Sequence, residues 1–243
     1  MAALEETLPE QDPGFSFAQV ASWYDRLNRL MSLGSDRRWR QSAAGQLHLG
    51  DGSRVLDVGT GTGDMALALR DRWPSSALVG LDPALEMMQQ AGTKRGAGSV
   101  GWTLGDGLQL PFPDECFDAV ISAFLLRNVG DVAAAIEEQV RVVRAPDLAA
   151  GRPGGQVAAL ELVWPRGRGC GTLFRFYFAK ALPALNGLLS GQRQAYRFLP
   201  QSVERFQTPD ELRITMEMAG LTKVRHHTMS WGTVALHVGE RAA

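Results

Sequence analysis

The sequence is poor in cysteine, contains no long apolar run and has no excess of charge of either sign. Cys116 and Cys170 lie far apart and lack metal-ligand neighbours, so we expect neither a disulfide framework nor a zinc site. No apolar run reaches the roughly 18 residues that a membrane-spanning helix needs. The 25 basic and 26 acidic residues give a net charge of -1, which argues against a nucleic-acid partner.

The first 25 residues contain no lysine or arginine but several acids. Secretory and transit peptides carry the opposite charge, so a cytoplasmic protein is expected. Residues 1–14, which include Pro9 and Pro13, are predicted to form a loose acidic tail. The chain has 243 residues and 45% hydrophobic content, so residues 15–243 can bury the core of a single domain.

The most informative stretch runs from Val55 to Asp64, where an apolar strand pattern leads through three glycines into a helix pattern. Glycine permits a sharp turn and a close approach of ligand to backbone, so Gly59–Gly63 indicates a nucleotide-like cofactor. The dinucleotide fingerprint has its third glycine one residue later, which disfavours NAD. The next predicted strand ends at Asp82, where an acid can accept both ribose hydroxyls. S-adenosylmethionine (SAM), with a ribose and no phosphate, fits better.

Strand-like and helix-like segments alternate along the rest of the chain. Strands are predicted near 53–59, 77–81, 100–104, 117–123 and 156–162, and helices near 36–47, 63–72, 84–94 and 131–143. This alternation predicts a parallel sheet with helices on both faces. A helix near 208–219 and strands near 221–228 and 231–238 follow, and a short turn at Met229–Ser230 would make the last two strands antiparallel.

Polar segments follow several of these strands, namely Gly59–Gly63, Asp82, Asp106 and Arg127–Asn128. In parallel sheets, ligands bind beyond the carboxyl ends of the strands, where the strand order reverses. We therefore expect these segments to form one composite site. For each residue alone, a turn or a helix cap is the alternative, because Asp and Asn favour both.

Two further regions flank this alternation. Residues 15–48 are predicted to form N-terminal lid helices, because apolar residues from Phe17 to Met31 recur at helical spacing. Tyr24 and Asn28 place polar groups on that face, which would either look into the site or pack at its edge. Residues 165–200 are interpreted as an inserted helical cap. No acid occurs between Glu161 and Glu204, whereas this segment holds six basic residues: Arg166, Arg168, Arg175, Lys180, Arg193 and Arg197.

Several separated motifs resemble the SAM-dependent C-methyltransferases of ubiquinone and menaquinone biosynthesis. They include Val20-Ala21 with Tyr24-Asp25, Val55 to Asp64, Gly105-Asp106 with Leu110-Pro111-Phe112, Leu126-Arg127-Asn128-Val129, Pro153-Gly154-Gly155, Leu160-Glu161, Ala195-Tyr196 and Val234-Ala235-Leu236-His237. The glycine loop and the Pro-Gly-Gly turn are common to many class I methyltransferases. The Leu-Arg-Asn-Val motif, the Tyr-Asp helix and the Val-Ala-Leu-His ending are far more specific to this family.

The resemblance implies an α/β class I methyltransferase (Rossmann-like) fold, with a seven-stranded sheet that is mostly parallel and has an antiparallel last strand. It places Thr62 in the SAM loop, Asp82 on the ribose, and Asp106 with Gly107 around the adenine. The full set of candidate cofactor-binding residues is Asp57, Gly59, Thr60, Gly61, Thr62, Gly63, Asp82, Asp106 and Gly107. We expect no metal ion, because methyl transfer from a sulfonium is an in-line displacement that depends on alignment.

The chain departs from the family in two places. Ala123-Phe124-Leu125 stands where the family often has Ser-Phe-Gly, which puts a serine contact in doubt. Ser122, one position earlier, should point to the other side of its strand. Residues 145–152 lengthen the turn before Pro153, and we interpret them as a surface loop insertion.

The implied reaction is C-methylation of a polyprenyl quinol ring, either demethylmenaquinol to menaquinol or 2-methoxy-6-polyprenyl-1,4-benzoquinol to its 5-methyl product. Arg127 stays protonated, so it is a candidate for holding the developing oxyanion, directly or through water. A structural ion pair is the alternative. Asn128 would fix the ring, and Tyr24 and Asp25 would orient the substrate or relay a proton. His237 lies inside a predicted strand and is expected to be structural.

Other interpretations stay open. The chain could methylate another lipid or small molecule, or serve as a SAM-binding scaffold in a quinone-synthesis complex. A homodimer is also compatible with the sequence. The acid-free segment from Leu162 to Val203 is predicted to contact an anionic membrane surface transiently, at the inner face of the membrane, because basic residues favour anionic lipid and aromatic rings favour the headgroup boundary. Alternatively, its aromatic residues, Phe174, Phe176, Tyr177 and Phe178, pack on the sheet or line a prenyl groove.

Overall fold

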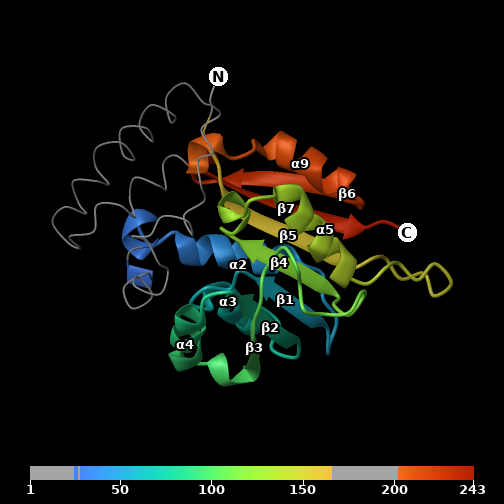
Figure 1. Cartoon of the computed structure of the whole chain (residues 1–243), viewed down its shortest axis with the longest axis horizontal. Helices are drawn as coiled ribbons and strands as arrows, with labels where there is room; N and C mark the ends of the chain where they lie inside the picture. The colour runs from blue at the N-terminus through green and yellow to red at the C-terminus, as the bar shows by residue number, and fades with distance from the viewer. Residues whose placement is uncertain (1–24, 27, 166–201) are drawn as a thin grey trace, which may run out of the picture.

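The computed structural model describes residues 25–26, 28–165 and 202–243, and the description below concerns these residues. A seven-stranded sheet runs through them in the order β3-β2-β1-β4-β5-β7-β6, from bottom to top in Figure 1. The strands are β1 (Arg54–Val58), β2 (Ala77–Asp82), β3 (Val100–Leu104), β4 (Ala119–Ala123), β5 (Gln156–Leu162), β6 (Leu221–Met229) and β7 (Val234–Arg241).

The first five strands of the sheet are parallel. The last strand, β7, pairs antiparallel with both β5 and β6. The chain moves outward from β1 to β3 on one side and then returns to place β4 on the other side of β1. This reversal between β1 and β4 is the switch point at which ligands bind in such sheets. The predicted mostly parallel sheet with an antiparallel last strand is thus confirmed.

Helices cover both faces of the sheet, as predicted. They are α2 (Asp36–Gln46), α3 (Asp64–Arg72), α4 (Leu85–Thr93), α5 (Val132–Val142) and α9 (Pro209–Met218). Alternate residues of β1 show the two layers, because Val55 packs with α2 and α3 whereas Leu56 packs with α5 and α9. Side chains alternate across a strand, so buried apolar residues in succession require a cover on each face.

Local hydrogen bonds fix where the later helices begin. The side chain of Asp131 accepts from the Ala134 N–H at the start of α5. At α9, Thr208 and Glu211 form a reciprocal capping box. The buried ring of His237 in β7 donates from Nε2 to the Pro209 carbonyl oxygen at 2.8 Å, which joins the sheet to the start of α9. This contact supports the structural role expected for His237.

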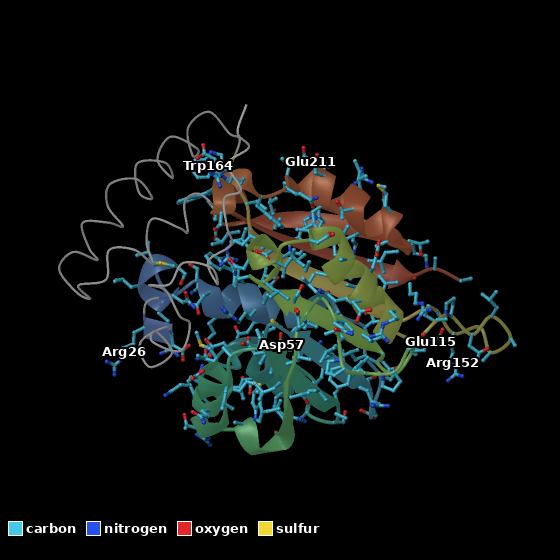
Figure 2. All side chains as sticks on the ribbon, viewed as in Figure 1. Arg26, Asp57, Glu115, Arg152, Trp164 and Glu211 are labelled. Atoms are coloured by element: carbon cyan, nitrogen blue, oxygen red, sulfur yellow. The ribbon has the colours of Figure 1, made fainter. Side chains whose placement is uncertain are left out.

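The turn between the last two strands differs from the prediction. The predicted strand near 231–238 begins only at Val234, because Ser230–Gly232 form a short 3-10 helix. Ser230 and Trp231 both adopt positive φ, of 49° and 56°, a conformation that their side chains disfavour and that no sequence signal marked. The insertion at 145–152 is a surface turn, as interpreted, closed by an Asp147–Arg152 bridge, and Figure 2 shows Arg152 at the edge of the molecule.

Several predictions fall outside the described residues. These are the acidic tail 1–14, the first part of the lid helices with Tyr24, and nearly all of the helical cap at 165–200 with its basic and aromatic residues. Of the predicted lid helices, residues 25–26 and 28–31 are helical, and α2 follows them. Within the described part of the chain, no helix combines the length and apolar content that crossing a membrane requires.

We expect Gly63→Ala to destabilise the fold strongly. Gly63 has φ 80°, and an added Cβ would lie 2.8 Å from Trp102 Cη2 and 3.0 Å from Ala91 Cβ. Strain and overpacking together should lower the free energy of unfolding by about 2–4 kcal/mol in urea titrations. Gly92→Ala is the matched control, because this α4 position has no neighbour within 4 Å of an added Cβ. It should be neutral or stabilising by up to about 1 kcal/mol. Equal urea midpoints for both variants would contradict this account.

Candidate active site

The loop after β1 is held tightly to the ends of two strands. The Thr60 N–H donates to the Leu81 carbonyl at 2.9 Å, and the Thr60 hydroxyl donates to Asp57 Oδ2 at 2.6 Å. Gly61 stands beyond these contacts with φ 54°, and an added Cβ there would meet nothing within 4 Å. The loop is therefore fixed from behind and open in front of Gly61, which is the shape that a ligand in contact with the backbone requires.

Asp82 ends β2 and reaches across to the glycine loop. Its Oδ2 accepts from the Gly61 N–H at 2.7 Å and its Oδ1 accepts from the Ala84 N–H at 2.9 Å, while the residue is only 8% exposed. A carboxylate oxygen can accept a second hydrogen bond. Asp82 can therefore receive ligand hydroxyls while still holding the loop.

Asp57 lies under the loop, near the end of β1, and is 1% exposed. Burial raises the pKa of its carboxyl to about 7, while the Thr60 hydroxyl and the charge of Arg40 act in the opposite direction. A carboxyl in this state can change charge near neutral pH, because small changes in its surroundings decide the protonation. It can thus respond electrostatically to a cationic ligand at the loop.

The loops after β1, β3 and β4 converge on Leu125. An added Cβ at Gly59 would lie 2.7 Å from Leu125 Cδ1, and one at Gly107 would lie 3.7 Å from Leu125 Cδ2. Asp106 is exposed, and its Oδ1 accepts from the Leu108 N–H at 2.9 Å, so it forms the turn that its residue type also favours. The structure thus brings the predicted segments Gly59–Gly63, Asp82 and Gly107 to one place at the switch point.

Arg127 and Asn128 lie in a 3-10 turn, Leu126–Asn128, directly after β4. Arg127 Nη1 donates to the carbonyl oxygen of Phe124 at 2.8 Å, and Asn128 Nδ2 donates to the same oxygen at 3.0 Å. Phe124 has φ 63°, an unfavourable conformation for a bulky residue. The turn therefore holds both candidate catalytic side chains on one backbone oxygen.

Glu161 fixes this turn to β5, and sequence reasoning assigned it no role. It is fully buried, accepts from the Leu126 N–H at 2.6 Å and pairs with Arg127 Nη1 at 3.0 Å. Burial raises the pKa of Glu161, and the charge of Arg127 opposes that rise. The signal that could have revealed it is an acid near the end of the otherwise apolar segment Val157–Leu162. The ion pair weighed as an alternative for Arg127 is present.

Asp25, a secondary catalytic candidate, is found at the glycine loop. Its Oδ1 accepts from the Thr62 hydroxyl at 2.5 Å, and its Oδ2 lies 2.6 Å from Lys94 Nζ. Thr62 itself is 3% exposed.

Ser122 is fully buried in β4, so it offers no replacement for the missing family serine. In the described part of the chain, no three His, Cys, Asp or Glu side chains form a group that could hold a metal ion.

A sheet of this order, with a glycine loop after β1 and an acid at the end of β2, defines a class I SAM-dependent methyltransferase. Residues 7–241 match the model of the ubiE/COQ5 methyltransferase family. The chain belongs to this family, and it is a methyltransferase.

Two curated relatives are similar over nearly the whole chain. A demethylmenaquinone methyltransferase of Thermus thermophilus is 42% identical over 228 residues, which cover 93% of this chain and 99% of that protein. A ubiquinone/menaquinone biosynthesis C-methyltransferase UbiE of Geobacter sulfurreducens is 38% identical over 231 residues, covering 93% of this chain and 86% of that protein.

Solved structures agree on the fold. The putative methyltransferase in complex with the Trm112 activator of Haloferax volcanii has a TM-score of 0.66 at 20% identity, covering 94% of this chain and 98% of that one. A possible histamine N-methyltransferase of Thermotoga maritima has a TM-score of 0.65 at 19% identity, covering 93% and 97%. At such identities the likeness concerns the fold alone.

We expect the stabilising effect of Asp57 to depend on pH. Its pKa is 3.8 ordinarily and about 7 in the fold, so between these values the folded protein retains a proton that the unfolded chain has released. Stability should therefore fall as pH rises through this window. Asp57→Asn lacks the titrating group. The free energy of unfolding of wild type minus that of Asp57→Asn should fall by about 2–4 kcal/mol from about pH 4 to 8. A difference that stays constant in denaturant titrations across this range would refute the shifted pKa.

Proposed function

We propose that this methyltransferase transfers the methyl group of SAM to a ring carbon of a polyprenyl quinol, either demethylmenaquinol or 2-methoxy-6-polyprenyl-1,4-benzoquinol. The printed names of the two curated relatives support this class of acceptor. The observation that carries the proposal is the Arg127–Asn128 turn, which Glu161 and Phe124 hold beside the glycine loop.

The residues at the switch point fit SAM. Asp82 would accept the ribose hydroxyls, Asp106 and Gly107 would flank the adenine, and the open side of Gly61 gives the methionine part access to the backbone. Asp57, Gly59, Thr60, Thr62 and Gly63 would shape the loop around it. Bound there, SAM supplies an electrophilic methyl group on a sulfonium.

Arg127 would act on the acceptor by charge. A ring carbon becomes nucleophilic when the neighbouring hydroxyl loses its proton, so the enzyme must hold an oxyanion. Guanidinium remains protonated and cannot readily take that proton, but it can stabilise the oxygen that loses it. Arg127 Nη1 is already used by Glu161 and the Phe124 carbonyl. The rest of the guanidinium would therefore hold the oxyanion, directly or through a water that it polarises.

The membrane and the N-terminal helix enter this proposal as well. A polyprenyl chain partitions into lipid, so we propose that the protein meets its acceptor at an anionic membrane surface. The basic and aromatic residues predicted to make this contact lie outside the described residues.

Asp25 would act at the cofactor loop, where it contacts Thr62, and Tyr24 stays a predicted acceptor contact.

A direct assay tests the function. Purified protein is incubated with SAM and either reduced quinol in anionic vesicles, and the lipid products are analysed by mass spectrometry. We expect the ring of one quinol to gain a methyl group and the oxidised quinone to be inert, because only the quinol can form the oxyanion. Methylation of neither quinol would overturn the proposal. Accumulation of one demethylated quinone in cells lacking the protein identifies the natural acceptor.

Asp82→Ala should weaken SAM binding by about 1–3 kcal/mol in calorimetry, because it strands the N–H groups of Gly61 and Ala84 as well as the ribose hydroxyls. Asp147→Ala is a suitable control, since it removes an acid that also accepts from a backbone N–H, that of Ala150, but lies in the surface turn at residues 145–152. The control should cost stability and leave SAM affinity unchanged. Unchanged affinity in Asp82→Ala would remove Asp82 from the site.

Arg127→Lys should lose most of the turnover while SAM affinity stays near wild type. Lysine keeps the charge but cannot hold Glu161 and the Phe124 carbonyl with one end of a planar fork and the acceptor with the other. Arg141→Lys is the matched control, because Arg141 also pairs with a glutamate, Glu138, but within the C-terminal half of α5. Steady-state rates with quinol decide the matter, and wild-type values for Arg127→Lys would show that the arginine is purely structural.

A further inference from the structure

We propose that Lys94 is a positioning residue of the cofactor site, whose ammonium group holds the N-terminal helical residues against the glycine loop. The inference rests on the proposed SAM site and adds to it a residue that none of the motifs marks. Lys94 directly follows α4, at its C-terminal cap. It therefore belongs to neither the glycine loop nor the strand ends from which the site was predicted.

A chain of polar contacts joins Lys94 to the loop. Lys94 Nζ lies 2.6 Å from Asp25 Oδ2, and the other oxygen of Asp25 accepts from the Thr62 hydroxyl at 2.5 Å. Lys94 also pairs with Asp64, the first residue of α3. Figure 2 shows the neighbouring Arg26 pointing outward from the same edge of the molecule, whereas Asp25 contacts the loop. One ammonium thus links three segments that are distant in sequence.

These contacts are substantially withdrawn from water. The side chains of Lys94, Asp25 and Asp64 are between 20% and 23% exposed, and Thr62 is 3% exposed. Charge pairs at such burial are screened less than pairs on an open surface. Among the described residues, the cluster holds two carboxylates, of Asp25 and Asp64, and one ammonium, so these contacts depend on the charge of Lys94.

Packing makes Lys94 the fixed member of this cluster. The last turn of α4 lies against the glycine loop so closely that an added Cβ at Gly63 would be 3.0 Å from Ala91 Cβ. Asp64 is also fixed, because a carboxylate in the first turn of a helix is favoured by the helix dipole. Asp25 is then the partner that would leave if the ammonium were removed, since two carboxylates would otherwise face each other. If Asp25 moved away, the Thr62 hydroxyl would lose its acceptor, and the helical residues that follow Asp25 would lose their contact with the glycine loop.

Removing the ammonium separates two explanations, because they predict opposite changes in SAM affinity. SAM carries a sulfonium and an ammonium against one carboxylate, so its net charge is positive. If the cluster acted on SAM only through charge, loss of Lys94 would make the site more negative and would tighten SAM binding. If Lys94 positions Asp25 over the loop, its loss opens the site and weakens SAM binding.

The test is calorimetry with SAM on Lys94→Met, which keeps a long unbranched side chain without the charge. We expect affinity to fall roughly tenfold, the scale of a lost hydrogen bond to a charged group. Lys94→Arg should stay within about threefold of wild type, because it restores the cation. The matched control is Lys223→Met, which breaks the Lys223–Glu240 pair on the last two strands and should bind SAM as wild type does.

A double-mutant cycle shows whether Lys94 acts through Asp25. Asp25→Asn alone should weaken SAM binding, and adding Lys94→Met to it should change affinity by no more than about twofold. In the SAM-free protein, either single variant should speed amide hydrogen exchange in residues 28–34 while α5 keeps its protection. This exchange measurement also serves if Lys94→Met is too unstable for calorimetry, since Asp25→Asn carries the same expectation.

Wild-type or tighter SAM affinity in Lys94→Met, or full additivity with Asp25→Asn, would overturn the positioning role. Such a result would leave the proposed function intact provided that wild-type protein still methylates the quinol. Failure of wild-type protein to bind SAM at all would instead count against the proposed function. The two failures are therefore distinguishable within one set of titrations.

Discussion

The candidate site depends on the glycine loop being held to the ends of β1 and β2. The Gly61 N–H donates to Asp82, and the Thr60 N–H donates to the Leu81 carbonyl, so the loop cannot shift without breaking bonds to β2. Because these groups are largely buried, an unmade bond would leave a desolvated donor or acceptor, at a cost of about 1–3 kcal/mol each. This constraint keeps the open side of Gly61 facing the space beyond the strands.

A second constraint organises the acceptor side, where Glu161 and Arg127 form a buried ion pair. Removing one partner of such a pair typically costs about 3–5 kcal/mol, whereas the intact pair contributes little net stability. The pair therefore serves mainly to orient Arg127, since Glu161 also accepts from the Leu126 N–H and so fixes the turn that carries Arg127. The positive φ of Phe124 is strain of the kind that persists where the surroundings enforce it.

Much of the fold could be predicted, because the sequence pattern of buried parallel strands is compatible with few other structures. Segments such as Val55–Val58 and Val157–Leu162 are mostly apolar on both faces, with one acid in each, and their alternation with helices permits little other than a covered parallel sheet. The start of β7 was placed too early because the turn before it is built from Ser230 and Trp231 with positive φ. Tertiary context, and not residue type, decided that conformation.

The sequence by itself determined the sheet, the glycine loop and the acid at the end of β2, because each is a local pattern whose backbone geometry follows from nearby residues. It also marked Arg127 and Asn128, through a motif. The tertiary structure alone decided that Arg127 pairs with Glu161, 34 residues away, and that Asp25 lies on Thr62, 37 residues away, with Lys94 beside it. Pairing of charges across such separations depends on which elements pack together and how deeply they are buried, and neither quantity is visible in a linear pattern.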